Sequence, residues 1–137
     1  MTGQDYDSRY VEYFERFNQQ HFFEAHEVLE ALWLPQRGGP NGSFYKGLIQ
    51  LAGVFVHWQK NRPGPAAALL GLARDNLLKY PATHDGLNLA GVLAMVEEWL
   101  LRVKAAGAAG QPLTLASPPQ LRLESSAHTT SRRGGTD

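Results

Sequence analysis

The chain has 137 residues, with 13 basic and 13 acidic side chains and no cysteine. This length suits one domain of about 100 residues with a tail. The balanced charge argues against a nucleic-acid partner or an anionic membrane, and the lack of cysteine excludes disulfides, thiolate zinc sites and cysteine nucleophiles. The sequence shows neither a secretory signal nor an apolar run of about 20 residues, so we expect a soluble, cytoplasmic protein.

The charges are unevenly distributed along the chain. Residues 1–34 carry seven acidic and two basic side chains, whereas the remainder carries six acidic and eleven basic ones. We therefore expect one acidic pole, which would suit a cation better than a phosphate.

Aromatic residues at spacings of three and four predict a first helix over residues 6–20, capped by Asp5 or Asp7. A second helix is predicted over residues 22–34. The loop 35–43 follows, because its prolines and glycines are costly in a helix.

Three more helices complete the predicted domain. The third spans residues 44–60, is capped by Ser43, and is apolar nearly all round, so it should be central. The fourth spans about 65–79. The fifth starts at Asp85 or Asn88 and ends near Lys104.

No segment alternates with a period of two residues, so no sheet is predicted. Residues 105–137 are rich in Ala, Gly, Pro, Ser and Thr, and cannot bury enough surface to offset chain entropy. The sequence predicts an all-α bundle of about five helices over residues 1–104 and a disordered, low-complexity tail over 105–137. Within that tail, only residues 113–123 have the apolar content to dock on the domain.

The second helix carries several ionisable residues beside its apolar arc. His26 and Glu30 lie one turn apart just past the edge of this arc, next to Trp33. Glu24 and Glu27 fall further round, and Glu27 joins the pair only if a neighbouring helix covers that side. Ionisable groups beside apolar surface need a partner or a metal, so this helix carries either a buried network or a site.

The third helix has a matching stripe. Its members are spaced 4, 3, 4 and 3 residues apart: Lys46, Gln50, Gly53, His57 and Lys60. If the two helices pack antiparallel, Gln50 and His57 could meet the pair on the second helix.

Two chemistries fit such a cluster. In one, His26, Glu30 and His57 bind a divalent metal and Glu27 acts as general base of a hydrolase-like enzyme. The spacing departs from the zinc-protease helix, because Glu30 stands where that motif needs its second histidine. In the other, the cluster is a hydrogen-bonded network, or an acid–base or small-ligand site without metal.

Three functions therefore remain open. The first is a binding or structural domain with its polar cluster in a cleft between helices: His26, Glu27, Glu30, Trp33, Gln50 and His57. The second is the metal-dependent enzyme. The third is a module whose aromatic face binds a partner helix. We expect no nucleic-acid or membrane partner, and a homo-oligomer is compatible with the sequence.

The motifs also resemble a known family. EAHEVLE at residues 24–30 with Trp33, GLIQ at 47–50 and the later His57 are together similar to domain of unknown function family 309, over about residues 6–100. The resemblance implies a small, cytosolic all-α domain and supplies no reaction. Carried over by position, the motif residues are Glu24, His26, Glu27, Glu30, Trp33, Gln50 and His57. The chain departs from the pattern at residues 63–65, where it reads Pro-Gly-Pro.

Overall fold

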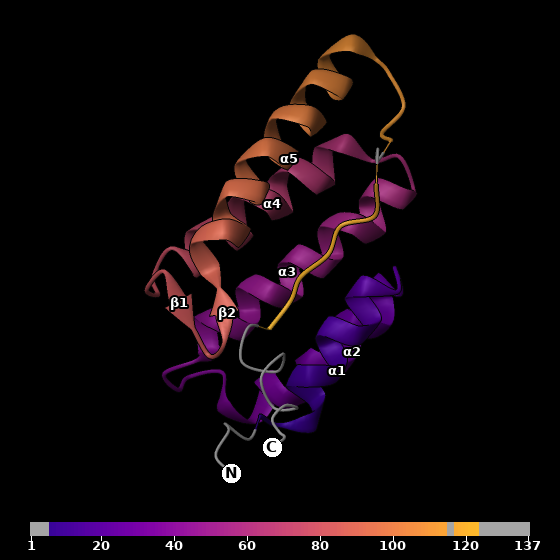
Figure 1. The fold of residues 1–137 in the computed structure, drawn as a ribbon. Helices are drawn as coiled ribbons and strands as arrows, with labels where there is room; N and C mark the ends of the chain where they lie inside the picture. The colour runs from indigo at the N-terminus through magenta and orange to yellow at the C-terminus, as the bar shows by residue number, and fades with distance from the viewer. Residues whose placement is uncertain (1–5, 115–116, 124–137) are drawn as a thin grey trace, which may run out of the picture.

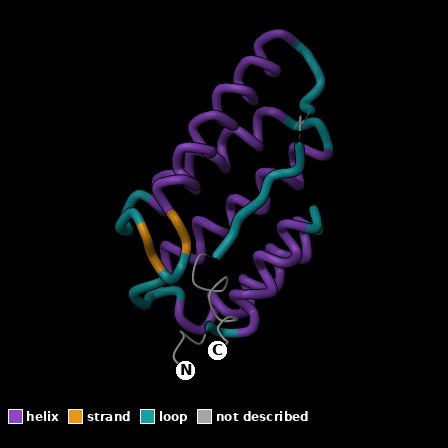
Figure 2. The backbone as a smooth tube through the Cα atoms, viewed as in Figure 1, coloured by secondary structure: helices purple, strands orange, loops and turns teal. Residues whose placement is uncertain are grey.

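Helices dominate the computed structural model, which describes residues 6–114 and 117–123 (Figures 1 and 2). In chain order, the elements are α1 (Ser8–Asn18), α2 (Phe22–Trp33), a short 3-10 helix (Leu34–Gln36), α3 (Gly42–Gln59), α4 (Pro63–Leu77), β1 (Thr83–His84), β2 (Leu87–Asn88) and α5 (Leu89–Ala109). The predicted all-α fold is confirmed, and each predicted helix is present.

Helix α3 is the central element, as its apolar sequence predicts. It packs against α2 on one side and α4 on the other, and most of its residues are buried. Aromatic rings of α1 and α2 fill the core beside it; for example, the ring centroids of Phe22 and Phe55 lie 5.2 Å apart. The core is therefore built outward from α3.

The helix starts follow local hydrogen bonding. The Asp7 side chain accepts from the Arg9 backbone N–H at 2.9 Å, and that of Asn88 accepts from the Gly91 N–H at 3.1 Å. The cap predicted at Ser43 is wrong, because α3 already begins at Gly42. A Cβ atom at Gly42 would lie 2.1 Å from the Arg37 carbonyl oxygen, so only glycine fits this helix start.

A two-stranded hairpin joins α4 to α5, so the prediction of no sheet is wrong at this point. Thr83 pairs with Asn88 and His84 pairs with Leu87, in antiparallel register. The turn between the strands has positive φ at Asp85 (46°) and Gly86 (75°). Strands of two residues are too short to produce a recognisable alternation.

The C-terminal region departs from the predicted boundary. Helix α5 continues past Lys104 to Ala109 and ends at Gly110, whose φ of 67° is typical of a helix C-terminus. Further on, the side chains of Leu121 and Leu123 are buried in the core, 1% and 6% exposed. The prediction of disorder is therefore corrected for these residues, and residues 124–137 of the predicted tail lie outside the described part.

None of the helices described here is long and apolar enough to cross a membrane.

Candidate functional site

Helices α2 and α3 pack antiparallel, which is the arrangement the sequence required for a shared site. Near the connection, the Trp33 indole N–H donates to the Gly42 carbonyl at 3.0 Å. At the other end, Phe22 of α2 meets Phe55 of α3. The two polar stripes predicted from the sequence therefore run along facing elements in opposite directions.

These stripes form a polar seam, the term used below for eight residues on three helices. Its members are His26, Glu30 and Trp33 of α2, Lys46, Gln50, Gly53 and His57 of α3, and Asn76 of α4. All eight are partly buried, between the enclosed core and open solvent. The seam is therefore a continuous border where polar groups meet the core.

Contacts across the seam fix its position between α2 and α4. The Lys46 ammonium lies 4.5 Å from the centroid of the Trp33 ring, which joins α3 to α2. The Asn76 side-chain N–H donates to the side-chain oxygen of Gln50 at 2.8 Å, which joins α3 to α4. One helical face of α3 thus contacts both neighbouring helices.

The antiparallel register places the remaining members. The Trp33–Lys46 contact lies near one end of the α2–α3 interface and the Phe22–Phe55 contact near the other, so Glu30 and His26 lie between them. A larger residue at position 53 would be crowded by α4, since a Cβ atom there would lie 3.1 Å from Leu69.

The two histidines of the seam share an unusual property. Nδ1 of His26 and Nδ1 of His57 are buried and have no hydrogen-bond partner among the described residues. Since Nε2 of neither ring is enclosed or bonded within the same part of the chain, this edge of each ring opens to solvent. Buried polar atoms are normally paired, so an unpaired nitrogen on each ring calls for an explanation.

Electrostatics favour the neutral form of one histidine. Burial, followed by the positive charges of Arg62 and Lys60, lowers the pKa of His57. A neutral imidazole carries one N–H donor and one acceptor. Because burying an unpaired N–H is the costlier option, we assign the proton to Nε2, which then offers a donor to solvent.

An exposed aromatic ring extends this surface. Phe23 is 57% exposed, and its ring stacks on that of His26 with centroids 6.1 Å apart and planes at 15°. Phe23 directly precedes the EAHEVLE motif, and the sequence pattern did not mark it as part of the site.

The carboxylates of α2 have no side-chain partner among the described residues. Glu30 is partly buried and Glu27 is exposed, and within the described residues neither makes a side-chain hydrogen bond or an ion pair. The exposed position of Glu27 gives no support to its predicted role as a general base beside the histidines.

The predicted metal-ligand set is not assembled. Among residues 6–114 and 117–123, no three His, Asp or Glu side chains gather where they could hold a metal ion. His26, Glu30 and His57 are distributed along the seam instead, because successive members of a helical stripe are separated by whole turns. The side-chain oxygen of Gln50 accepts from Asn76, and Gln50 forms no hydrogen bond with either histidine in the described structure.

Two polar groups of the structure were missed by the sequence analysis. Asn76 was hidden in an Ala/Leu-rich helix, although its place between the buried residues Ala73 and Leu77 is the signal that could have revealed it. The other group lies at the hairpin. The Asn41 side-chain N–H donates to the Asp85 carboxylate at 2.7 Å, and the Asn41 side-chain oxygen lies 2.9 Å from Nε2 of His84.

The cluster of Asn41, His84 and Asp85 at the hairpin has a structural role. The Tyr10 hydroxyl donates to the Asp85 carbonyl at 2.9 Å, and burial raises the Tyr10 pKa well above its usual range. Asn41 bonds both His84 and Asp85, and Tyr10 bonds the backbone at Asp85, so this cluster holds the turn against α1 and α3.

The fold and the seam together define a small, all-α helical domain with a polar surface at the border of its core. The family described as "Domain of unknown function (DUF309)" matches residues 10–69, which confirms the resemblance. This match includes every member of the seam except Asn76.

A longer protein of Aquifex aeolicus (strain VF5), with the printed name "Uncharacterized protein", is 27% identical to this chain over 106 residues. That match covers 77% of this chain and 29% of the relative, so the chain spans less than a third of the length of the curated relative. No solved structure matches the chain.

Proposed function

We propose that this protein is a non-catalytic binding domain, and that the polar seam takes a small polar ligand. The observation that supports the proposal is the pair of histidines, each of which buries an Nδ1 atom that no described residue bonds, while both rings remain partly exposed. An arrangement selected for stability alone would pair these nitrogens or replace the rings with apolar ones.

The groups along the seam describe the chemistry of the ligand. Glu30 offers an unpaired carboxylate, Lys46 offers an ammonium over an indole ring, and the two imidazoles offer N–H donors. Both signs of charge and both hydrogen-bonding roles are therefore available within four helical turns. A dipolar molecule with its own donors and acceptors suits this set better than a purely anionic or apolar one.

The longer relative supports a modular role. The matched region makes up 29% of the Aquifex aeolicus protein, so a similar domain is used there as part of a larger chain. A binding module can be joined to other domains without rebuilding its site, because it carries its own core.

Nuclear magnetic resonance on the ¹⁵N-labelled full chain tests the proposal. The probes are a panel of free amino acids, nucleotides, polyamines and small carboxylic acids. We expect at least one dipolar probe to shift the amide signals of Glu30, Lys46 and His57 in a saturable way. His57→Phe should weaken that binding about tenfold, since it removes one donor to the ligand.

His21→Phe is the matched control, because His21 is exposed and precedes α2. It should leave the affinity unchanged. Probes that shift only residues outside the seam, or that bind the His57→Phe protein as tightly as the wild type, would contradict the proposal.

A further inference from the structure

One face of α5 is exposed along the whole length of the helix. We call it the α5 stripe; its members recur at alternating spacings of four and three residues, and all are exposed: Ala90, Ala94, Glu97, Leu101, Lys104 and Ala108. Leu101 lies in the middle of the stripe and is 71% exposed, more than any other large apolar side chain of the described residues. The stripe is therefore a surface with one large apolar anchor and small residues toward both ends.

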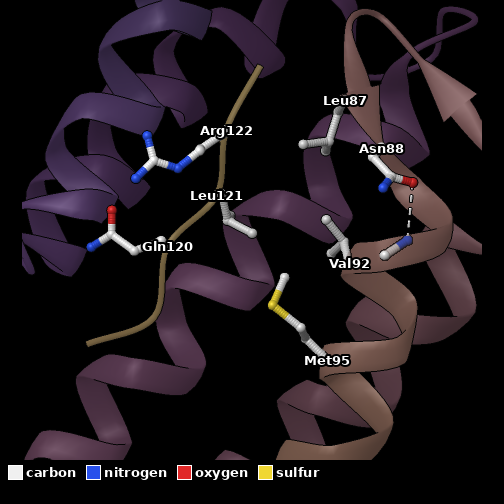
Figure 3. Close-up of a pocket in the computed structure, with 8 residues that line it drawn as sticks. Leu87, Asn88, Val92, Met95, Gln120, Leu121 and Arg122 are labelled. Atoms are coloured by element: carbon white, nitrogen blue, oxygen red, sulfur yellow. Dashed lines mark hydrogen bonds between the residues drawn. The ribbon is translucent and has the colours of Figure 1, made fainter. Parts of the chain in front are cut away.

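The opposite face of α5 is covered by the domain. Val92 and Met95 of α5 point toward Leu121 near the end of the described chain (Figure 3). Val96 and Val103 are fully buried, and the helix packs beside α4 (Figure 1). The α5 stripe thus points away from the bundle, and a partner can reach it without a rearrangement of the fold.

Opposite charges flank Leu101 on the stripe. Glu97 lies one turn before it and Lys104 one turn after it, and both side chains are exposed. The Glu97 carboxylate approaches Arg74 of α4 only to 3.6 Å, and Lys104 forms no ion pair within the described part of the chain. At about 100° per residue, Glu97 and Lys104 fall on the same side of Leu101. The two signs of charge therefore lie at nearly equal distances from the centre of the stripe.

This pattern is self-complementary in one orientation only. If two copies of α5 pair antiparallel about a two-fold axis at Leu101, Glu97 of each chain meets the partner's Lys104, and Ala94 meets the partner's Ala108. In a parallel pair, each glutamate would instead face the partner's glutamate and each lysine the partner's lysine, which is unfavourable. The alanines add little bulk, so the two helix axes can approach closely enough for the leucines to touch.

We propose that a second copy of this chain docks on the α5 stripe, as an antiparallel pair of α5 helices related by a two-fold axis. The Leu101 side chains meet at the axis, and two ion pairs between Glu97 and the partner's Lys104 set the orientation. One helix face buries less area than a typical stable dimer needs, so the pair is weak and reversible. None of these residues belongs to the polar seam, so this inference does not rest on the proposed function.

Disulfide trapping tests the contact and its orientation together, because the chain has no cysteine of its own. Leu101→Cys should give a cross-linked dimer under mild oxidation, since the two sulfurs meet at the axis. In the antiparallel pair, the two copies of position 94 lie about 21 Å apart along the helices, and so do the two copies of position 108. Ala94→Cys and Ala108→Cys should therefore stay monomeric alone and cross-link when they are mixed.

The rates of cross-linking decide between an ordered pair and other outcomes. If Ala94→Cys cross-links with itself as fast as in the mixture, the helices pair in parallel or the chains meet at random. If Leu101→Cys cross-links no faster than Ala94→Cys, the leucines do not meet at an axis. Either result overturns the proposal.

Sedimentation velocity on the full chain measures the association without a cross-link. We expect the wild type to dimerise reversibly, with a larger dimer fraction at about 500 µM than at about 10 µM. Leu101→Glu should weaken association about tenfold, because it places two carboxylates together at the axis. Leu34→Glu is the matched control; Leu34 is 47% exposed, lies outside the α5 stripe, and should leave the dimer unchanged when replaced. A wild type that stays monomeric over this range, or a dimer that Leu101→Glu leaves intact, contradicts the proposal.

Charge exchange separates the ion pairs from the leucine contact. Lys104→Glu should weaken association about threefold, since each new glutamate then faces the partner's Glu97. Adding Glu97→Lys to this variant restores opposite charges across the axis and should recover most of the lost affinity. If the double variant associates no better than Lys104→Glu alone, the proposed pairing of the two helices is wrong.

Discussion

At the scale of single residues, the histidines of the seam behave differently from those at the hairpin. His84 is paired with Asn41 and packs on Phe44 with centroids 4.7 Å apart. His26 and His57 instead bury a nitrogen that has no hydrogen-bond partner in the described part of the chain. The first arrangement stabilises a turn, whereas the second leaves hydrogen-bonding capacity unused in the free protein.

The lowered pKa of His57 makes stability depend on pH. Burial, Arg62 and Lys60 disfavour its protonated form in the folded state, so the unfolded chain binds the proton more tightly. Stability should therefore fall as the pH drops through the unfolded pKa, near 6.5, toward the lower folded value. His57→Gln removes this effect. When the pH is lowered from about 7.5 to about 5, the melting temperature of the wild type should therefore fall further than that of the variant.

Thermal melts followed by circular dichroism at several pH values measure this difference. His21→Gln serves as the control and should track the wild type over the same range, because His21 is exposed. Parallel curves for the wild type and His57→Gln would show that the folded state does not resist protonation of His57.

At the scale of secondary-structure elements, the contact between α3 and α4 is tightest at Gly47. A Cβ atom at Gly47 would lie 2.8 Å from Cγ and Cδ2 of Leu77, which is fully buried and cannot move aside. By contrast, a Cβ atom at Gly71 of α4 meets nothing within 4 Å.

These two glycines form a matched pair for mutation. We expect Gly47→Ala to lower the free energy of unfolding by about 1–3 kcal/mol, because it overpacks the contact between α3 and α4. Gly71→Ala should raise it by about 0.5–1 kcal/mol through its better helix propensity. Urea denaturation measures both values, and a neutral Gly47→Ala would show that α4 does not pack this closely.

The periodicity of the sequence made the helices predictable. The predictions that needed correction concern features that depend on tertiary contacts. The spacing of aromatic residues in α1 and the apolar character of α3 follow directly from helical geometry. The start of α3 at Gly42 depends on the approach of the Arg37 carbonyl, and the burial of Leu121 depends on Asn18, about a hundred residues earlier in the chain. Local patterns carry no record of such distant partners.

At the scale of the whole molecule, the central helix decides where the polar seam lies. The seam runs where α3 meets α2 and α4, whereas residues 121–123 pack on the other side, held by Asn18 of α1. The antiparallel packing of α2 and α3 followed from the short connection between them, so the facing stripes could be predicted. The hydrogen bond between Gln50 and Asn76 could not, because it requires the position of a fourth helix.

The separation of His26 and His57 also depends on how the helices are placed relative to one another. Sequence spacing shows which residues share a helical face, but the register between two helices decides which members of two faces meet. Phe55 packs on Phe22 at the start of α2, so His57 lies near that end of the helix pair and His26 lies about one turn further in. The seam is therefore a row of separate groups, and the compact metal-ligand set expected from the sequence does not form in the described structure.

The free energy of unfolding of His26→Phe and His57→Phe, measured with urea, tests most directly whether the seam is kept for binding. Phenylalanine keeps a planar ring and removes the unpaired nitrogen, so both variants should be unchanged or more stable by up to about 1 kcal/mol. Gln50→Ala is the comparison; it should cost about 1–2 kcal/mol, because it leaves the Asn76 amide without its partner. If both histidine variants lose as much stability as Gln50→Ala, the seam is a structural network and the account is wrong.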